Sequence, residues 1–334
     1  MATLCFLGTG CGTLNYLLQA TGGQLALINR AKPISEVLED EKTPPRVKEL
    51  LSQIGDIKEF GEENGLKPTP NYTTYTKLDR KAAVWVVSAC EKLKFKPKVW
   101  KFPIVGSFPY LGWFNLDSAK NYADELKAKG WDVDVRGASA YSTLGWFHDP
   151  VLSTMISKGD AAFGDLVNTV IHESVHATVY VNGQSYFNES LANYVAGKLT
   201  DVYLFRKYGE KAPRTVAYLK EEKRGDEAEK RLHEAYEELS RIYSSAAPDS
   251  EKLDEKNKIL ANLMAELHLK RPINNATLIQ YKTYNTGEEA FEALYLSCGK
   301  TWPCFIQRMK ELTPRSFAKM QEEDFSPTVR GLAR

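Results

Sequence analysis

The sequence predicts an α+β fold that is mainly helical, with a small sheet and a long helical hairpin that projects from the body as an arm. Apolar residues recur at helical spacing along most of the chain, which indicates amphipathic helices. Short aromatic runs bounded by Pro and Gly in residues 97–137 are typical of strands. Residues 210–271 are dense in charge, carry leucines on one face and contain a turn near Pro248, which predicts the hairpin. The regions that we expect are 1–11, 12–165, 166–209, 210–271 and 272–334.

Composition excludes some classes of protein. A chain of 334 residues can bury a large core, in one domain or two. A formal net charge of +1 argues against bulk electrostatic binding to nucleic acid or to an anionic membrane. No apolar stretch reaches about 18 residues, so we predict no transmembrane helix.

The N-terminus contains a short apolar run, residues 4–10, that ends in small residues before Cys11. This pattern is similar to the tail of a bacterial lipoprotein signal, in which Cys11 would be lipidated and would tether the protein to the cell envelope, facing the periplasm. Basic residues are missing before the run, and the run is short for a signal core. A buried first segment therefore stays the alternative.

The region before residue 140 mixes helices and strands. Residues 14–66 are expected to be helical, with breaks at Pro33 and Pro44-Pro45. Residues 81–93 fit either a helix or a buried strand. A helix should follow Asp117 as its N-cap. The expected strands are short, and we interpret their aromatic residues as core; they cover residues 100–102, 109–114 and 131–136.

Residues 172–176 read His-Glu-Ser-Val-His, within apolar residues at helical spacing. On a helix, positions i and i+4 lie one above the other, so His172 and His176 can reach one Zn²⁺. Glu173 then lies beside the metal, where it can accept a proton from water. A chance match is a rare event because the chain has only five histidines, and structural zinc would favour four Cys or His ligands. We therefore predict one catalytic Zn²⁺ per chain.

A third ligand is expected, because catalytic zinc keeps three protein ligands and one open position. The best candidate is Glu189, which follows a turn at residues 182–185. A second helix that starts at Ser185 or Asn188 would bring Glu189 back to the metal. Asn193, one turn further, is a candidate hydrogen-bond partner of a ligating imidazole. His148 could compete as a ligand, but its neighbouring Asp-Pro turn favours a loop.

Peptide hydrolysis at such a site needs a donor for the developing oxyanion. Tyr284 is the first candidate and Tyr141 the second, although a packed aromatic residue is the alternative for both. Asn275 is a candidate to orient Tyr284 or a ligand. Residues 138–150 fit an edge strand that pairs with the substrate backbone, or a plain loop.

The C-terminal region returns to the body after the arm. Cys298 and Cys304 flank a short loop and fit either a local disulfide or two buried thiols. We expect the polar tail after Pro314 to fray. His233 and His268 lie on the arm and are not expected to bind metal.

Several segments together resemble the bacterial "putative aminopeptidase" lipoproteins, a gluzincin-like group of HExxH proteins. The matching segments span nearly the whole chain and are Cys11, 16–20, 23–25, 140–147, 172–176, 187–190 and 273–276. The run Tyr-Ser-Thr-Leu-Gly-Trp-Phe at 141–147 is far more specific than the zinc motif. The resemblance implies a zincin-like core and a zinc metallopeptidase outside the cytoplasm that acts on peptide or protein substrates.

The wider gluzincin pattern implies His172, His176 and Glu189 as zinc ligands, with Glu173 as the general base. Asn193 stands where thermolysin-like members carry Asp, and a neutral partner would polarise an imidazole less. The Gly-x-Met-Glu-Asn motif of the large aminopeptidases is absent. Aminopeptidase and endopeptidase action therefore both stay open.

Two other functions fit the same motif. One is a non-hydrolytic zinc-binding envelope protein, whose helical arm recruits a partner. The other is a zinc amidase that acts on cell-wall peptides. A buried HExxH segment without metal is a third alternative.

Overall fold

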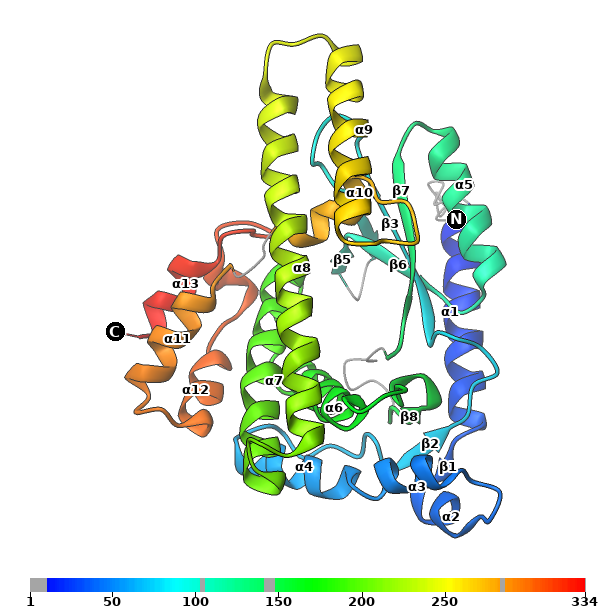
Figure 1. Cartoon of the computed structure of the whole chain (residues 1–334), viewed down its shortest axis with the longest axis vertical. Helices are drawn as coiled ribbons and strands as arrows, with labels where there is room; N and C mark the ends of the chain where they lie inside the picture. Colours follow the sequence, from blue (N-terminus) through cyan, green and yellow to red (C-terminus); the bar gives the residue numbers. More distant parts are fainter. Residues whose placement is uncertain (1–10, 103–105, 141–147, 283–285, 334) are drawn as a thin grey trace, which may run out of the picture.

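The computed structural model describes residues 11–102, 106–140, 148–282 and 286–333 (Figure 1). These residues are mainly helical with three small sheets, which confirms the predicted α+β class. The helices are α1 (Cys11–Asn29), α2 (Ile34–Glu39), α3 (Pro45–Leu51), α4 (Ile54–Glu63), α5 (Leu116–Ala128), α6 (Ala162–Thr178), α7 (Ser185–Tyr208), α8 (Pro213–Ser244), α9 (Asp249–Glu266), α10 (Asn275–Leu278), α11 (Glu288–Ser297), α12 (Trp302–Met309) and α13 (Ser326–Leu332). The strands are β1 (Lys32–Pro33), β2 (Thr74–Thr76), β3 (Val84–Cys90), β4 (Trp100–Phe102), β5 (Gly106–Phe108), β6 (Tyr110–Trp113), β7 (Asp132–Ala138) and β8 (Val151–Leu152).

The antiparallel sheet β6-β3-β7 lies above α6 and α7 in Figure 1. Its middle strand resolves the ambiguity at residues 81–93, because β3 is almost wholly buried and rich in β-branched residues, as expected of a strand covered on both faces. One face carries Val87, Leu111 and Val133 and packs against α5. The opposite face meets α10.

The helix after β6 begins earlier than expected. Its N-cap is Asn115, whose side-chain oxygen accepts a hydrogen bond from the backbone N–H of Ser118 at 2.8 Å. The prediction of Asp117 as N-cap was wrong. Asp117 instead lies in the first turn, where its negative charge is favourable.

Helices α6 and α7 form the centre of the largest hydrophobic cluster, and α4 and α8 pack against them. Near its start, α8 comes close to α6, where the ring of Tyr218 on α8 lies against Gly164 on α6. A Cβ atom on Gly164 would lie 2.3 Å from that ring, so only glycine allows α8 to cross α6 at this point.

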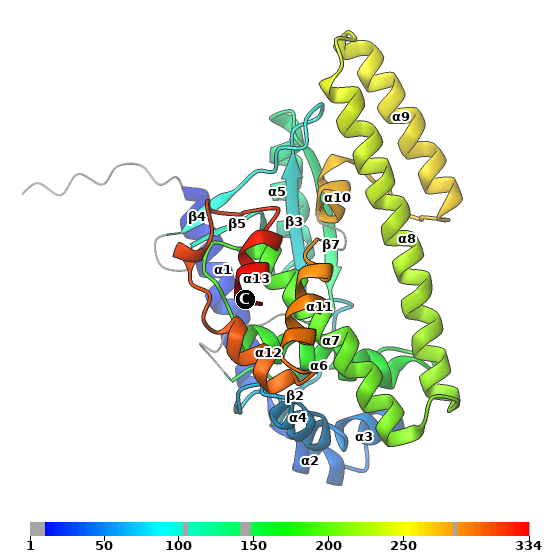
Figure 2. The same ribbon diagram turned by 90° about the vertical axis from the view of Figure 1, so that its left-hand side faces the viewer.

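Helices α8 and α9 form the predicted hairpin and project beyond the body (Figure 2). Leu239, Leu260 and Leu263 pack between the two helices. Most of the charged residues of the arm are exposed, as a solvated helix face requires.

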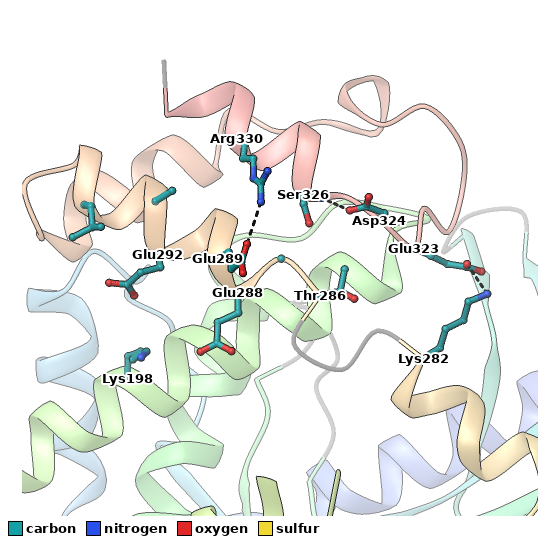
Figure 3. A pocket seen from close by; sticks show the side chains of 13 residues that line it. Lys198, Lys282, Thr286, Glu288, Glu289, Glu292, Glu323, Asp324, Ser326 and Arg330 are labelled. Atoms are coloured by element: carbon teal, nitrogen blue, oxygen red, sulfur yellow. Dashed lines mark hydrogen bonds and ion pairs between the residues drawn. The ribbon is translucent and has the colours of Figure 1, made fainter. Parts of the chain in front are cut away.

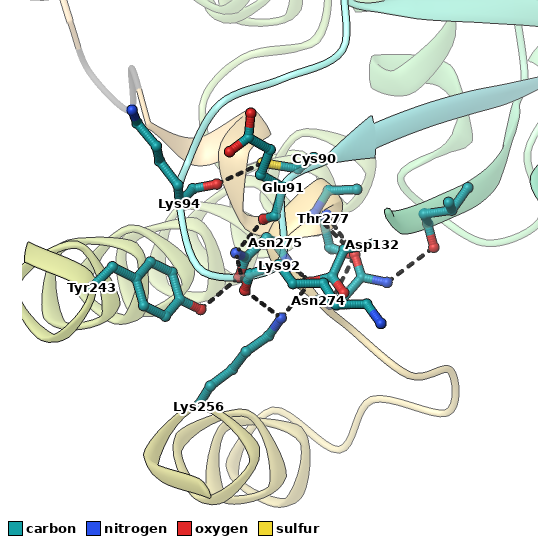
Figure 4. A network of polar contacts seen from close by, with 12 residues as sticks. Cys90, Glu91, Lys92, Lys94, Asp132, Tyr243, Lys256, Asn274, Asn275 and Thr277 are labelled. Carbon is teal, nitrogen blue, oxygen red and sulfur yellow. Dashed lines mark hydrogen bonds and ion pairs between the residues drawn. The ribbon is translucent and has the colours of Figure 1, made fainter. Parts of the chain in front are cut away.

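A buried polar network joins the arm to one end of the sheet (Figure 4). The Lys256 ammonium from α9 lies 2.5 Å from the Asp132 carboxylate of β7. Asn275, fully buried, donates to the carbonyl oxygens of Glu91 and Lys92 at 2.9 Å each and accepts from the Tyr243 hydroxyl at 2.8 Å. Both the nitrogen and the oxygen of the Asn275 amide thus hold the arm on the sheet.

The C-terminal tail is ordered rather than frayed. Phe317, Phe325 and Val329 are buried, and α13 packs against α11 and α12. The prediction of a frayed tail was wrong because these apolar residues fill the space beside α11. The structure pairs Cys298 with Cys304 in a disulfide, one of the two alternatives that the sequence left open. Within the described ranges, every helix is too short or too polar to cross a bilayer.

We expect Asn275→Ala to lower the free energy of unfolding by about 2–4 kcal/mol, because it leaves buried carbonyl and hydroxyl groups without their partner. Urea denaturation followed by circular dichroism measures the change. Asn257→Ala, at an exposed position on α9, is the matched control and should change the stability by less than about 0.5 kcal/mol. Equal stability of the two variants would contradict the anchoring role of the network.

Candidate metal centre

Helix α6 carries both histidines of the HExxH segment. Its buried side includes Val170, Ile171 and Val175, which fix the helix in the core. His176 is buried and His172 partly buried. Residues four apart share a face, so the two imidazole rings lie next to each other, with centroids 4.7 Å apart.

The turn between α6 and α7 is closed by the side chain of Asn188. Its amide nitrogen donates to the carbonyl oxygen of Val181, and its amide oxygen accepts from the Val181 N–H, both at 2.9 Å. Helix α7 starts at Ser185, one of the two predicted starts. Because Asn188 is itself in the first turn of α7, this pair of hydrogen bonds sets where Glu189 points.

The donor atoms of His172, His176 and Glu189 converge. The two Nε2 atoms are 3.1 Å apart, and the Glu189 Oε2 atom lies 3.5 Å from that of His172 and 3.7 Å from that of His176. Zinc bound tetrahedrally at about 2.0–2.1 Å requires donor atoms about 3.3–3.4 Å apart. Two imidazole nitrogens and one carboxylate oxygen therefore fit Zn²⁺ in both chemistry and spacing.

Charges within the site are closely coupled. Burial would raise the pKa of the Glu189 carboxyl, but hydrogen bonds and charge interactions with both imidazoles lower it well below its usual range. Burial raises the pKa of Glu173 to about 7, with His172 lowering it and Glu189 and Asp149 raising it further. The Oε2 atom of Glu173 is buried without a hydrogen-bond partner among the described residues. An unpartnered carboxylate oxygen beside three converging donors is the arrangement that proton transfer from water requires.

Asn193 and Asn275, which the sequence predicts as hydrogen-bond partners near the metal, make no described hydrogen bond to the three candidate metal-binding side chains. Asn193 is exposed, and within the described ranges no hydrogen bond joins it to either imidazole. The Nδ1 atom of His176 is buried and has no described partner. Asn275 belongs to the network at the base of the arm, where both N–H groups and the oxygen of its amide are engaged. Asn193 lies one turn from Glu189 on the same helix, as the helical spacing predicts, but its side chain is exposed.

Tyr284, Tyr141 and most of the proposed edge segment lie outside the described residues. The described part of that segment begins where the outer strand β7 ends, at Ala138. His148 is exposed and is not part of the donor group found in the described ranges.

Sequence reasoning missed residues that the fold brings beside Glu173. Asp149 is buried and holds the loop at residues 71–72: its N–H donates to Asn71 Oδ1 at 3.1 Å, and its carbonyl accepts from the Tyr72 N–H at 2.7 Å. Tyr72 is buried with a φ of 64°, a strained value for a bulky residue. Burial and then the charges of Glu173 and Asp149 raise the pKa of its hydroxyl. Such strain clusters at functional sites, but no sequence pattern near Tyr72 pointed to the metal motif.

Tyr110, at the start of β6, is partly buried, and the charges of the site act on it in addition to the core packing that the sequence predicts. Burial raises the pKa of its hydroxyl, and the charges of Glu189, Tyr180, Arg136 and Glu173 also act on it. Its hydroxyl therefore lies within electrostatic range of the proposed ligand and the proposed base.

Residues of the tail brace the turn before Glu189. The Gln184 amide donates to the Lys319 carbonyl at 2.6 Å and accepts from the Glu322 N–H at 2.9 Å. The Gln321 N–H donates to the Gly183 carbonyl at 2.8 Å, and its amide oxygen accepts from the Ser185 N–H at 3.1 Å. The position of α7 relative to α6 thus depends on residues far away in the sequence.

A separate pocket of about 930 Å³ lies between α7, α11 and the tail (Figure 3). The metal donors do not line it. Two ion pairs lie in its lining, Lys282 with Glu323 and Arg330 with Glu289. The group of residues that could hold a metal ion lies elsewhere, on α6 and α7.

An HExxH helix followed by a helix that returns a carboxylate to the same point brings together three side chains that could hold a metal ion. The chain matches the family model described as "Putative aminopeptidase" over residues 15–323. It therefore belongs to that family, whose description supports peptidase activity. Comparisons with curated proteins and with solved structures found no match.

We expect purified wild-type protein to carry about one zinc per chain and Glu189→Ala to lose most of it, because three protein ligands hold catalytic zinc. Elemental analysis after zinc reconstitution and dialysis measures the content. Asn193→Ala, one turn along the same helix, is the matched control and should keep its zinc. Equal zinc in wild type and Glu189→Ala would move the third ligand elsewhere, and no zinc in wild type would leave the motif without a metal.

Proposed function

We propose that the protein is a zinc-dependent peptidase that hydrolyses peptide bonds by activating a water molecule. The observation that carries the proposal is the convergence of three donor atoms beside the buried Oε2 atom of Glu173, which has no hydrogen-bond partner among the described residues. The family described as "Putative aminopeptidase" supports the same reaction class.

His172, His176 and Glu189 would hold the metal. A zinc ion there would supply Lewis-acid polarisation of the scissile carbonyl and a lowered pKa of bound water. Glu173 accepts the proton of the attacking water and later delivers it to the nitrogen of the leaving amine. Its burial removes competing water, so the proton passes between Glu173 and the reactants.

The developing oxyanion needs a hydrogen-bond donor. Tyr284 and Tyr141 remain the proposals from the sequence, in that order. Tyr110 is a third candidate donor, because its raised pKa keeps the hydroxyl protonated and the charges of Glu173 and Glu189 act on it.

Two finer points belong to the proposal. The family description supports cleavage from a free amino terminus, and comparing peptides with free and acetylated amino termini separates it from endopeptidase action. Attachment to the bacterial envelope through a lipidated Cys11 follows from the sequence pattern at residues 4–11.

We expect Glu173→Gln to lower kcat by about 10²–10⁴-fold while zinc stays bound, because glutamine keeps the shape but cannot accept a proton. Hydrolysis of a peptide library, followed by mass spectrometry, gives the rates. Glu238→Gln, on the exposed side of α8, is the matched control and should retain wild-type rates.

Other outcomes would identify the rival functions. Zinc-loaded wild type that leaves every peptide intact but cleaves cell-wall amide bonds is an amidase. If the protein cleaves neither peptides nor cell-wall amides, and if cells that carry Glu173→Gln keep the wild-type phenotype, the protein acts by binding a partner.

A further inference from the structure

The face of the sheet that meets α10 carries a row of polar residues. Strand register sets Tyr110 and Asp134 on either side of Ser88, with Arg136 one pair further along β7. Side chains two apart on a strand share a face, so Arg136 lies on the same face as Asp134 and Tyr110. The opposite face is the apolar one that packs on α5.

Arg136 differs from its cationic neighbours because no carboxylate in the described ranges forms an ion pair with it. Arg271 is paired with Asp134 at 2.5 Å, and Lys282 with Glu323 at 2.5 Å. Among the described residues, no ion pair or hydrogen bond involves the Arg136 guanidinium, which is exposed. Asp134, two residues away on the same strand, is buried and already engaged by Arg271.

Tyr110 connects this guanidinium to the metal donors. The charges of Glu189, Glu173 and Arg136 all act on its hydroxyl. The strand segment just before Tyr110 also lies against the start of α7, because the Gln321 amide donates to the Ser107 carbonyl at 2.9 Å and accepts from the Ser185 N–H at 3.1 Å. An extended peptide covers about 3.3–3.6 Å per residue, so a substrate cleaved beside Glu173 reaches Arg136 within a few residues.

We propose that Arg136 binds a carboxylate of the substrate and thereby directs the site toward peptides with a negative charge a few residues from the scissile bond. A guanidinium presents two parallel N–H groups to a carboxylate and remains charged at every physiological pH. The inference rests on the proposed function for its substrate class. The carboxylate has two sources, the C-terminus of a short peptide and an acidic side chain.

The experiment measures kcat/KM on two peptide pairs with zinc-loaded protein. Trialanine and its amide test the terminal carboxylate; Ala-Ala-Glu amide and Ala-Ala-Gln amide test an acidic side chain. We expect wild type to prefer the charged member of at least one pair by about 10- to 100-fold, and Arg136→Gln to abolish the preference by slowing that member alone. Arg136→Lys should restore part of it.

Arg224→Gln, at an exposed position on α8, is the matched control and should keep the wild-type preference. Calorimetry then measures binding of the same peptides to Glu173→Gln protein, with and without Arg136→Gln. This measurement separates carboxylate binding by Arg136 from the proposed peptidase activity. Carboxylate-dependent binding without hydrolysis by wild type would support the role of Arg136 and reject the peptidase. Equal binding and hydrolysis of charged and amidated peptides, or a preference that survives Arg136→Gln, would overturn the role of Arg136.

Discussion

The site depends on the paired hydrogen bonds between Asn188 and the backbone of Val181. A helix by itself can align two histidines, because its geometry is local. It cannot supply the third donor, which has to come from another segment at a fixed angle. Asn188 fixes that angle by closing the turn with its own side chain, one residue before Glu189. The buried amide gives a directional constraint that apolar packing of α6 against α7 would not give.

The two faces of the sheet β6-β3-β7 have different roles. Its apolar face joins α5 and completes a small core of its own. Its polar face holds the arm at one end, through Asp132, and approaches the metal donors through Tyr110. The arm is therefore attached to the same rigid element that forms part of the surroundings of the site, so the network around Asn275 stabilises both.

The sequence was sufficient for whatever depends on local periodicity. Helical spacing predicted the hairpin arm and the neighbouring positions of His172 and His176, and turn chemistry predicted a helix start at Ser185 or Asn188, of which the structure has Ser185. Prediction from the sequence failed where contacts between distant segments determine the position of a side chain. Asn275 lay in a segment that resembled the family and was assigned to the site, but the fold uses its amide at the arm. Tyr110, Asp149 and Tyr72 reach the site only through strand register and loop closure, which no local pattern encodes.

The bracing of the turn by Gln321 and its neighbours has a consequence for the order of assembly. These contacts join residues about 135 positions apart, and contacts of such long separation form late because closing a long loop costs entropy. During synthesis the histidines emerge first, and a chain cut before Lys319 has both but lacks the support that aligns α7. Completion of the donor set thus requires that the chain has been made through Glu322 and has folded onto the turn before α7.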